Sequence, residues 1–121
     1  MTDNDVIIKV TDPRGYTVSL TKERYYDHIL RDSNHTKIEI ADISNAISNP
    51  NYIYRSTRPN TIEYYRSGSV HYPTLFTHVS VAEYDDSGDV RTAYHTKKIA
   101  ENSIVSFEKG GCLYVNINNK L

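Results

Sequence analysis

The feature that most constrains the fold is a change in hydrophobic period halfway along the chain. Between residues 52 and 96, apolar and polar side chains alternate in four runs: YIYRS (52–56), TIEYYRS (61–67), PTLFTHVSVAEY (73–84) and DVRTAYHT (89–96). Three groups of turn-forming residues separate them: Arg58-Pro59-Asn60, Gly68-Ser69 and Asp85-Asp86-Ser87-Gly88. Alternation with a period of two predicts β-strands, and Gly, Pro, Asn and Asp between the runs predict turns. The second half is therefore predicted to be an antiparallel meander.

The first half carries a hairpin pattern followed by helical patterns. VIIKV (6–10) and YTVSL (16–20) flank the turn Asp12-Pro13-Arg14-Gly15, which predicts a β-hairpin. Residues 21–32 have apolar side chains at helical spacing behind Thr21, a good cap residue, and predict a first helix. Residues 36–48 place isoleucines on one stripe and predict a second helix, which ends at Asn49-Pro50-Asn51.

Together these elements predict a single α+β domain spanning residues 1–121. We expect the N-terminal hairpin and the two helices to pack on a four-stranded antiparallel sheet. The tail, residues 103–117, holds one or two further short strands. One face of such a sheet can stay open to solvent, and an open polar face is a binding surface.

Composition narrows the classes of partner and the compartment. Fourteen Lys and Arg residues against 15 Asp and Glu residues give a net charge of -1, so any anion site must be local. The single cysteine, Cys112, cannot form an internal disulfide. No apolar run approaches the roughly 20 residues of a membrane helix, or resembles a signal peptide. We therefore expect a protein of a reducing, cytoplasmic compartment without membrane contact.

Several kinds of chemistry lack their sequence motifs. The five histidines form no helix pair with metal-ligand spacing and have no cysteine cluster beside them, so we expect no metal and no cofactor. The chain also has no glycine-rich phosphate loop and no Gly-x-Ser-x-Gly elbow.

The polar residues that remain favour metal-free RNA cleavage. In that reaction the 2′-OH attacks the adjacent phosphate, which requires a base, an acid and a fixed positive charge. Histidine, arginine, tyrosine and threonine can supply these groups, and neighbouring strands bring side chains within about 5 Å of one another. We therefore expect one polar patch on the sheet and the first helix.

Each residue of that patch also has a structural interpretation. His28 can be a histidine of the helix surface, and His78, within the longest strand run, a hydrogen-bonded structural one. Arg55, Arg58 and Arg66 can be solvated charges, although only Glu63 opposes them locally. Tyr64 and Tyr65 face opposite sides of their strand.

The alternation of the last strand run separates its side chains into two sets. Val90, Thr92, Tyr94 and Thr96 face one way, whereas Arg91, Ala93, His95 and Lys97 face the other. The two sets therefore cannot line the same site.

The order of these motifs resembles a known nuclease superfamily. The helix segment SLTKERYYDHIL, then NPNYIYRS, IEYYRS, LFTHVSVAEY and VRTAYHTKKI follow one another from about Val6 to Val115. They resemble the phage- and toxin-associated nuclease domains of the barnase, EndoU, colicin and RelE superfamily. The resemblance implies a helix pair on a four-stranded antiparallel sheet and metal-independent ribonuclease activity.

The resemblance also implies the site residues. It assigns the catalytic positions to His28, Arg55, Tyr65, Arg66, Thr92 and Tyr94. His28 would be the base or acid, Arg55 or Arg66 the phosphate clamp, and Thr92 with Tyr94 the phosphate-positioning hydroxyls. Ser56, Arg58 and Lys97 are the expected substrate-binding residues.

Three functions follow from these patterns as alternatives. The first is a ribonuclease acting on RNA such as tRNA or mRNA, as a toxin or an effector of a phage or mobile element. The second is a non-catalytic interaction module whose Tyr-rich sheet face binds a protein, such as an antitoxin, an immunity protein or a host factor. The third is a structural phage component.

Overall fold

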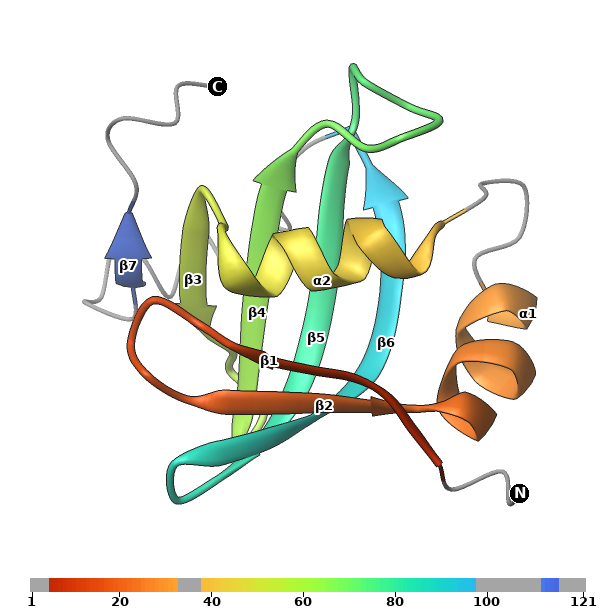
Figure 1. Ribbon diagram of the computed structural model, residues 1–121. Helices are drawn as coiled ribbons and strands as arrows, with labels where there is room; N and C mark the ends of the chain where they lie inside the picture. The colour runs from red at the N-terminus through yellow and green to blue at the C-terminus, as the bar shows by residue number, and fades with distance from the viewer. Residues whose placement is uncertain (1–4, 33–37, 98–111, 116–121) are drawn as a thin grey trace.

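The computed structural model describes residues 5–32, 38–97 and 112–115 (Figure 1). In chain order the elements are β1 (Val6–Thr11), β2 (Thr17–Thr21), the π-helix η1 (Arg24–Ile29), α1 (Leu30–Asp32), α2 (Ile40–Ser48), β3 (Tyr52–Arg55), β4 (Thr61–Ser67), β5 (Phe76–Tyr84), β6 (Ser87–Thr96) and β7 (Cys112–Val115). The hairpin, both helical regions and the four meander strands lie where the sequence predicts them. Only residues 112–115 of the expected tail strands are within the described part of the chain.

The strands form one seven-stranded mixed sheet in the order β1-β2-β6-β5-β4-β3-β7. Neighbouring strands are antiparallel except β2 and β6, which pair in parallel along Thr17–Ser19 and Ser87–Asp89. The prediction of a hairpin packed on a four-stranded antiparallel sheet is therefore wrong. The predicted meander is the centre of a larger sheet, which the hairpin extends at one edge and β7 at the other.

Gly88 lies in β6 at the point where the hairpin joins the sheet. This residue pairs with Val18 of β2 on one side and with Glu83 of β5 on the other. A Cβ atom at Gly88 would lie only 2.6 Å from Cγ1 of Val81 and 3.1 Å from the carbonyl oxygen of Ala82. The missing side chain allows β6 to lie close to β5 at the point where β2 pairs with the other edge of β6. From the sequence Gly88 is predicted to lie in a turn, so the pairing of β2 with β6 is not predicted.

The two helical regions do not pack on the sheet as a pair, which is a further correction to the predicted fold. Helix α2 alone crosses the sheet face, whereas η1 and α1 lie beside β6 and β2 (Figure 1). The backbone N–H of Arg24 donates to the Thr21 hydroxyl, which confirms the predicted cap. The Tyr25 hydroxyl donates to the carbonyl oxygen of Ile38 and so ties η1 to the chain just before α2.

The turn of the N-terminal hairpin is held by the side chain of Asp12. Its Oδ1 accepts the backbone N–H groups of Arg14 at 2.8 Å and Tyr16 at 3.0 Å, and Gly15 takes the positive φ of 94° that the turn requires. Its Oδ2 accepts the hydroxyl of Tyr64, on the interior strand β4, at 2.7 Å. The hairpin is therefore bonded to the middle of the sheet through buried polar groups.

The main core lies between α2 and the sheet face that it covers. Ile43, Ala46 and Ile47 of α2 are fully buried. The strand residues in the same apolar cluster include Ile53, Ile62, Tyr64, Val79, Val81, Val90 and Ala93. Because strand side chains alternate, the intervening residues of β3 to β6 face away from α2. Tyr64 and Tyr65 lie on opposite faces as predicted, and both are fully buried.

A β-bulge corrects the predicted alternation of β6. The register shifts between Ser80 and Val81 of β5, so that Ser80 faces Thr92 and Val81 faces Val90, with Arg91 as the extra residue. Val90 and Ala93 consequently both join the core under α2. Thr92 therefore does not share a face with Val90, contrary to the prediction from strict alternation.

Candidate active site

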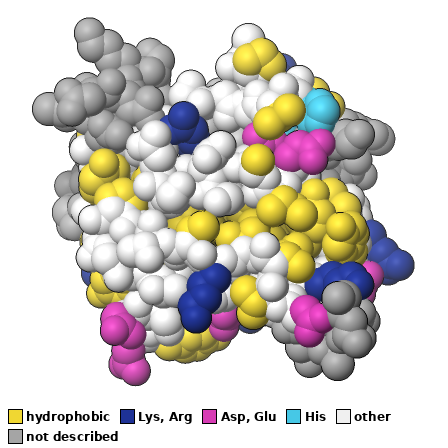
Figure 2. Space-filling model, in the orientation of Figure 1, with side chains coloured by type: hydrophobic (Ala, Val, Ile, Leu, Met, Phe, Trp, Pro, Cys, Tyr) yellow, Lys and Arg dark blue, Asp and Glu magenta, His cyan; other side chains and the backbone are white. Residues whose placement is uncertain are grey.

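The candidate site is a polar pocket on the sheet face opposite α2. On the α2 face, Lys and Arg side chains lie in separate places and several have acidic side chains beside them (Figure 2). On the opposite face, a pocket of about 210 Å³ opens over strands β4, β5 and β6 and the loop between β3 and β4. Its lining residues are Ser56, Arg58, Thr61, Glu63, His78, Ser80, Thr92 and Tyr94.

A carboxylate and an imidazole lie together in this pocket. Nε2 of His78 is 2.8 Å from Oε1 of Glu63, and the side chains are only 3% and 9% exposed. Glu63 is the direct cross-strand partner of Ser80, so His78 is its diagonal neighbour on β5. Diagonal pairs of long side chains are within contact reach across antiparallel strands. The sheet register therefore brings these two titratable groups together.

Aromatic rings fix the orientation of His78. The register pairs Tyr65, His78 and Tyr94 in a row across β4, β5 and β6. The Tyr65 ring stacks on His78 with centroids 4.4 Å apart and an angle of 5°, and the Tyr94 ring meets His78 edge-on at 4.7 Å. His78 is thus held between two aromatic rings and cannot rotate without displacing one of them.

The second ring nitrogen of His78 is buried without a partner. Among the described residues, Nδ1 of His78 makes no hydrogen bond. A buried polar atom without a partner costs free energy, and most buried polar atoms in proteins have one. This atom therefore requires an explanation, and a role in proton transfer or a bond to an ordered water molecule would provide it.

Tyr94 supplies a hydroxyl that stays protonated. Burial raises the pKa of Tyr94 to about 12, and the neighbouring Tyr65 and Glu63 act in the same direction, whereas Arg58 opposes them. The residue is still 36% exposed, so its side chain is accessible to a ligand. At neutral pH, Tyr94 is therefore a hydrogen-bond donor beside the Glu63–His78 pair.

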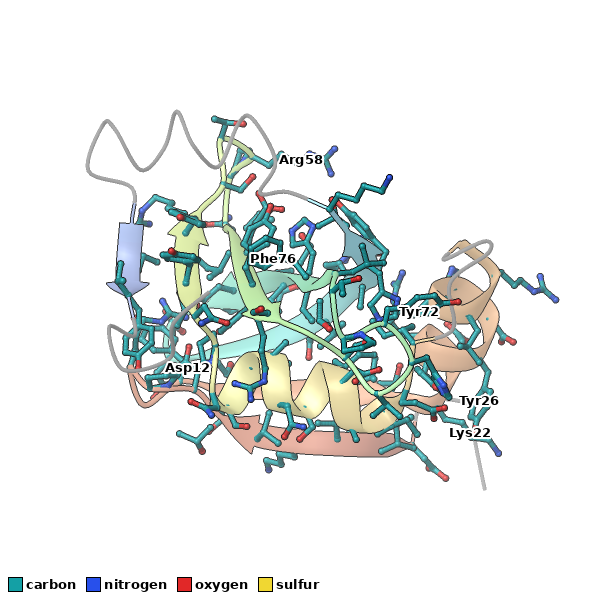
Figure 3. The ribbon with its side chains drawn as sticks, turned by 90° about the horizontal axis from the view of Figure 1, so that it is seen from above. Asp12, Lys22, Tyr26, Arg58, Tyr72 and Phe76 are labelled. Carbon is teal, nitrogen blue, oxygen red and sulfur yellow. The ribbon has the colours of Figure 1, made fainter. Side chains whose placement is uncertain are left out.

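Arg58 brings a positive charge to the mouth of the pocket. It lies on the side of the strands away from α2 (Figure 3). Its backbone N–H donates to the Ser56 hydroxyl at 3.1 Å, and the Ser56 N–H donates to the carbonyl oxygen of Thr61 at 2.9 Å. These bonds close the β3–β4 loop and hold Arg58 at the pocket.

The structure brings four of the nine sequence-predicted site residues into this pocket: Ser56, Arg58, Thr92 and Tyr94. Tyr65 lies directly behind it as the ring stacked on His78. Arg55 lines the neighbouring pocket at the end of β3.

The other three predicted residues lie elsewhere. Arg66 is on the opposite face of β4 from Tyr65 and donates to the carbonyl oxygen of Asn49 at 2.6 Å, beyond the end of α2. His28 is on η1, with its side chain 46% exposed and its Nε2 3.9 Å from Glu23. Lys97 is exposed just after β6. His28, Arg66 and Lys97 are not among the residues that line the pocket.

The sequence reasoning missed the Glu63–His78 pair as a functional unit. It treated Glu63 only as the charge opposing nearby arginines, and His78 as a hydrogen-bonded structural histidine. His78 is indeed buried and bonded, but its partner is a carboxylate inside a pocket. The sequence does predict that both residues lie on the open face of adjacent strands. Only the strand register shows that the two side chains are neighbours.

Within residues 5–32, 38–97 and 112–115, no His, Cys, Asp or Glu side chains form a group of three that could hold a metal ion. No helix in these ranges is long and apolar enough to cross a membrane.

Comparisons with protein-family models, with curated proteins and with solved structures found no match to this chain.

Proposed function

We propose that this protein is a metal-independent ribonuclease that cleaves RNA through attack of a 2′-OH on the adjacent phosphate. The observation that carries the proposal is the Glu63–His78 pair at 2.8 Å inside a polar pocket that Arg58 also lines. A carboxylate and an imidazole provide the proton transfer that this reaction needs, and arginine provides the compensating charge.

The reaction balances with the groups of the pocket. The Glu63–His78 pair accepts the proton of the 2′-OH as the 2′-oxygen forms a bond to phosphorus. The bond from phosphorus to the 5′-oxygen breaks, and the Tyr94 hydroxyl donates a proton to that leaving oxygen. The products are a 2′,3′-cyclic phosphate and a free 5′-hydroxyl, and the pair returns its proton to Tyr94 through water.

Two further residues have roles in the transition state. The Arg58 guanidinium compensates the charge that develops on the phosphoryl oxygens, for which a planar fork of N–H donors is well suited. The Thr92 hydroxyl donates a hydrogen bond to one of these oxygens, which orients the phosphate. Tyr65 is a positioning residue that acts through the ring of His78.

The first experiment measures cleavage of single-stranded and structured RNAs by the purified protein in EDTA. We expect products that end in a 2′,3′-cyclic phosphate. Glu63→Gln should lower kcat by about 100-fold or more, since general acid–base groups contribute 10²–10⁴-fold. Intact RNA across the panel, with folded wild-type protein, would contradict the proposal.

Two variants keep this experiment informative if replacement of buried Glu63 impairs folding. Thr92→Val removes a partly exposed hydroxyl with almost no change in shape and should lower kcat at an unchanged melting temperature. His28→Gln tests the assignment that the superfamily resemblance implies. Loss of activity in His28→Gln, with full activity in Thr92→Val, would indicate that His28, and not the Glu63–His78 pocket, is the catalytic site.

A further inference from the structure

Two partly exposed aromatic rings lie on the same sheet face as the candidate active site. Tyr94 lines the pocket and is 36% exposed, and Phe76, at the start of β5, is half-buried. Phe76 lies two residues before His78 and therefore faces the same side of the sheet. The register pairs His78 with Tyr94 and Phe76 with Thr96, which makes Phe76 the diagonal neighbour of Tyr94. Diagonal neighbours lie about 7–8 Å apart, so both rings are close enough to contact the same ligand.

The orientation of both rings is fixed by one shared pair of aromatic side chains. Tyr65, which is fully buried, is perpendicular to the Phe76 ring, with centroids 6.2 Å apart and an angle of 89°. Tyr94 meets His78 at 75°, and His78 stacks on Tyr65 at 5°. Phe76 and Tyr94 therefore both stand steeply to the Tyr65–His78 stack, which holds them in place. Rings that are already ordered lose little conformational freedom when a ligand binds, which lowers the cost of binding.

The site differs in chemistry between its two ends along β5. Arg58 and Thr61 line the pocket at the β3–β4 loop. Thr61 pairs with Ala82, four residues after His78, whereas Phe76 lies two residues before it. The loop that carries Arg58 and the ring of Phe76 are therefore on opposite sides of His78. A nucleotide has the same two parts, an anionic phosphate and a flat base, so the guanidinium and the aromatic rings match one ligand.

The proposed reaction indicates which base lies at the aromatic end. The Tyr94 hydroxyl donates its proton to the leaving 5′-oxygen, which belongs to the nucleoside on the 3′ side of the scissile phosphate. We propose that Phe76, together with the ring of Tyr94, stacks the base of this nucleoside. The inference rests on the proposed ribonuclease function and specifies its substrate class, single-stranded RNA. In a double helix the faces of each base are covered by neighbouring bases, whereas an unpaired base can stack on an aromatic side chain.

The test uses two oligonucleotides that each have one cleavable bond. A single ribonucleotide stands in a 2′-O-methyl strand, and the next nucleotide on its 3′ side either carries adenine or lacks a base. We expect kcat/KM to be about 5- to 150-fold lower for the strand without the base, which corresponds to the 1–3 kcal/mol of one stacked base. Phe76→Leu should lower kcat/KM by about fivefold or more on the strand with adenine and leave it unchanged on the other.

Two variants separate stacking from a structural effect of the substitution. Phe76→Tyr keeps the ring and should cleave both strands as wild type does. Tyr26→Leu removes a ring that is 50% exposed on η1 and does not line the pocket, and it should change neither rate. Equal cleavage of the two strands by wild type, or an equal loss on both strands in Phe76→Leu, would overturn the base site alone.

A second measurement reports binding without cleavage. The same two strands are made fully 2′-O-methylated, so that neither can be cut. We expect Phe76→Leu to raise the Kd for the strand with adenine by about fivefold or more and to leave the Kd for the other strand unchanged. This pattern in a folded protein that cleaves no RNA would overturn the proposed ribonuclease function but support the base site. An unchanged Kd for both strands in Phe76→Leu would overturn the base site.

Discussion

The Tyr94 side chain shows how one residue can be both a structural and a chemical part of the site. Its ring edge packs on His78, so it helps to orient the imidazole. Its hydroxyl lies in a partly buried setting that raises its pKa to about 12. Such a group is not ionised at neutral pH, and it is still more acidic than the 5′-hydroxyl, the conjugate acid of the alkoxide that leaves in RNA cleavage. These properties fit a proton donor.

Tyr94→Phe tests this role because it keeps the ring and removes only the hydroxyl. We expect kcat on RNA to fall at least tenfold, since loss of a general acid removes part of a 10²–10⁴-fold contribution. The melting temperature should change little because the packing on His78 remains. Tyr84→Phe, the same change at a residue that is 52% exposed and does not line the pocket, is the matched control.

Equal kcat values for Tyr94→Phe and wild type would show that a group other than Tyr94 donates the proton to the leaving 5′-oxygen. A parallel loss of activity in Tyr84→Phe would instead indicate a general effect of losing surface hydroxyls.

Tyr64 and Asp12 show a different use of buried polar residues, one that concerns stability. The Asp12 carboxylate accepts the Tyr64 hydroxyl at 2.7 Å and the Arg14 guanidinium at 2.7 Å. Tyr64→Phe leaves a buried carboxylate without one of its donors and should lower the free energy of unfolding by about 1–3 kcal/mol. Urea unfolding measures this change.

Tyr16→Phe, which removes a partly exposed hydroxyl from the same hairpin, is a control for Tyr64→Phe. If Tyr64→Phe were as stable as wild type, the bond between the hairpin turn and β4 would contribute nothing to the free energy of unfolding.

At the scale of elements, the close approach of β6 to β5 beside the hairpin depends on Gly88. Its neighbours leave no room for a side chain, because a Cβ would lie 2.6 Å from Val81. Gly88→Ala should therefore lower the free energy of unfolding by about 1–3 kcal/mol through overpacking. Gly15→Ala is a comparison of a different kind, since open space surrounds Gly15 and only its positive φ of 94° opposes the change.

Hydrogen exchange tests whether Gly88→Ala destabilises the sheet locally. In Gly88→Ala, backbone amides of Thr17–Ser19 should lose protection first, because they face Ser87–Asp89 across the parallel pairing. Uniform loss of protection throughout the sheet would contradict a local role for Gly88.

Local signals predicted the elements and the pairing of strands adjacent in the chain, but not the pairing between distant segments. Thr21 as a cap, Asn49-Pro50 as a helix end and the turn residues between strands each act within a few residues, and the structure confirms them. The parallel contact of β2 with β6 joins segments about 70 residues apart, and no local sequence pattern indicates it. The bulge at Arg91 likewise depends on the partner strand.

At the scale of the whole molecule, the residues of the candidate site could be predicted from the sequence in part, but their pairing across strands could not. Thr92, Tyr94, Ser56 and Arg58 were predicted as site residues and do share a pocket. The pairing of Glu63 with His78 follows from the β4–β5 register, which places Glu63 opposite Ser80. A shift of one residue would turn Glu63 away from this face. The chemistry of the site is therefore a property of the assembled sheet.

The stability of the whole molecule should depend on pH through His95. This histidine of β6 lies under α2 and the β4–β5 loop, 4.0 Å from Asp42 and against the ring of Tyr72. Among the described residues, neither of its ring nitrogens makes a hydrogen bond. Burial lowers the pKa of His95, which Asp42 partly opposes, whereas His71 adds to the lowering.

The sign of the effect follows from this lowered pKa. The unfolded chain binds a proton at His95 near the ordinary pKa of about 6.5, before the folded protein does. The contribution of neutral His95 to stability is complete above pH 6.5 and is lost as the pH falls through the lower pKa of the folded state. The loss has a slope of at most about 1.4 kcal/mol per pH unit, and urea unfolding at several pH values measures it.

His95→Gln isolates the contribution because glutamine cannot take up this proton. We expect its free energy of unfolding to be lower than that of wild type at pH 7.5, through lost packing on Tyr72, but to fall less steeply between pH 6.5 and 5. His28→Gln is the matched control, since the His28 side chain on η1 is 46% exposed. If His95→Gln and wild type lost stability in parallel on acidification, other groups would be responsible for the acid sensitivity of the fold.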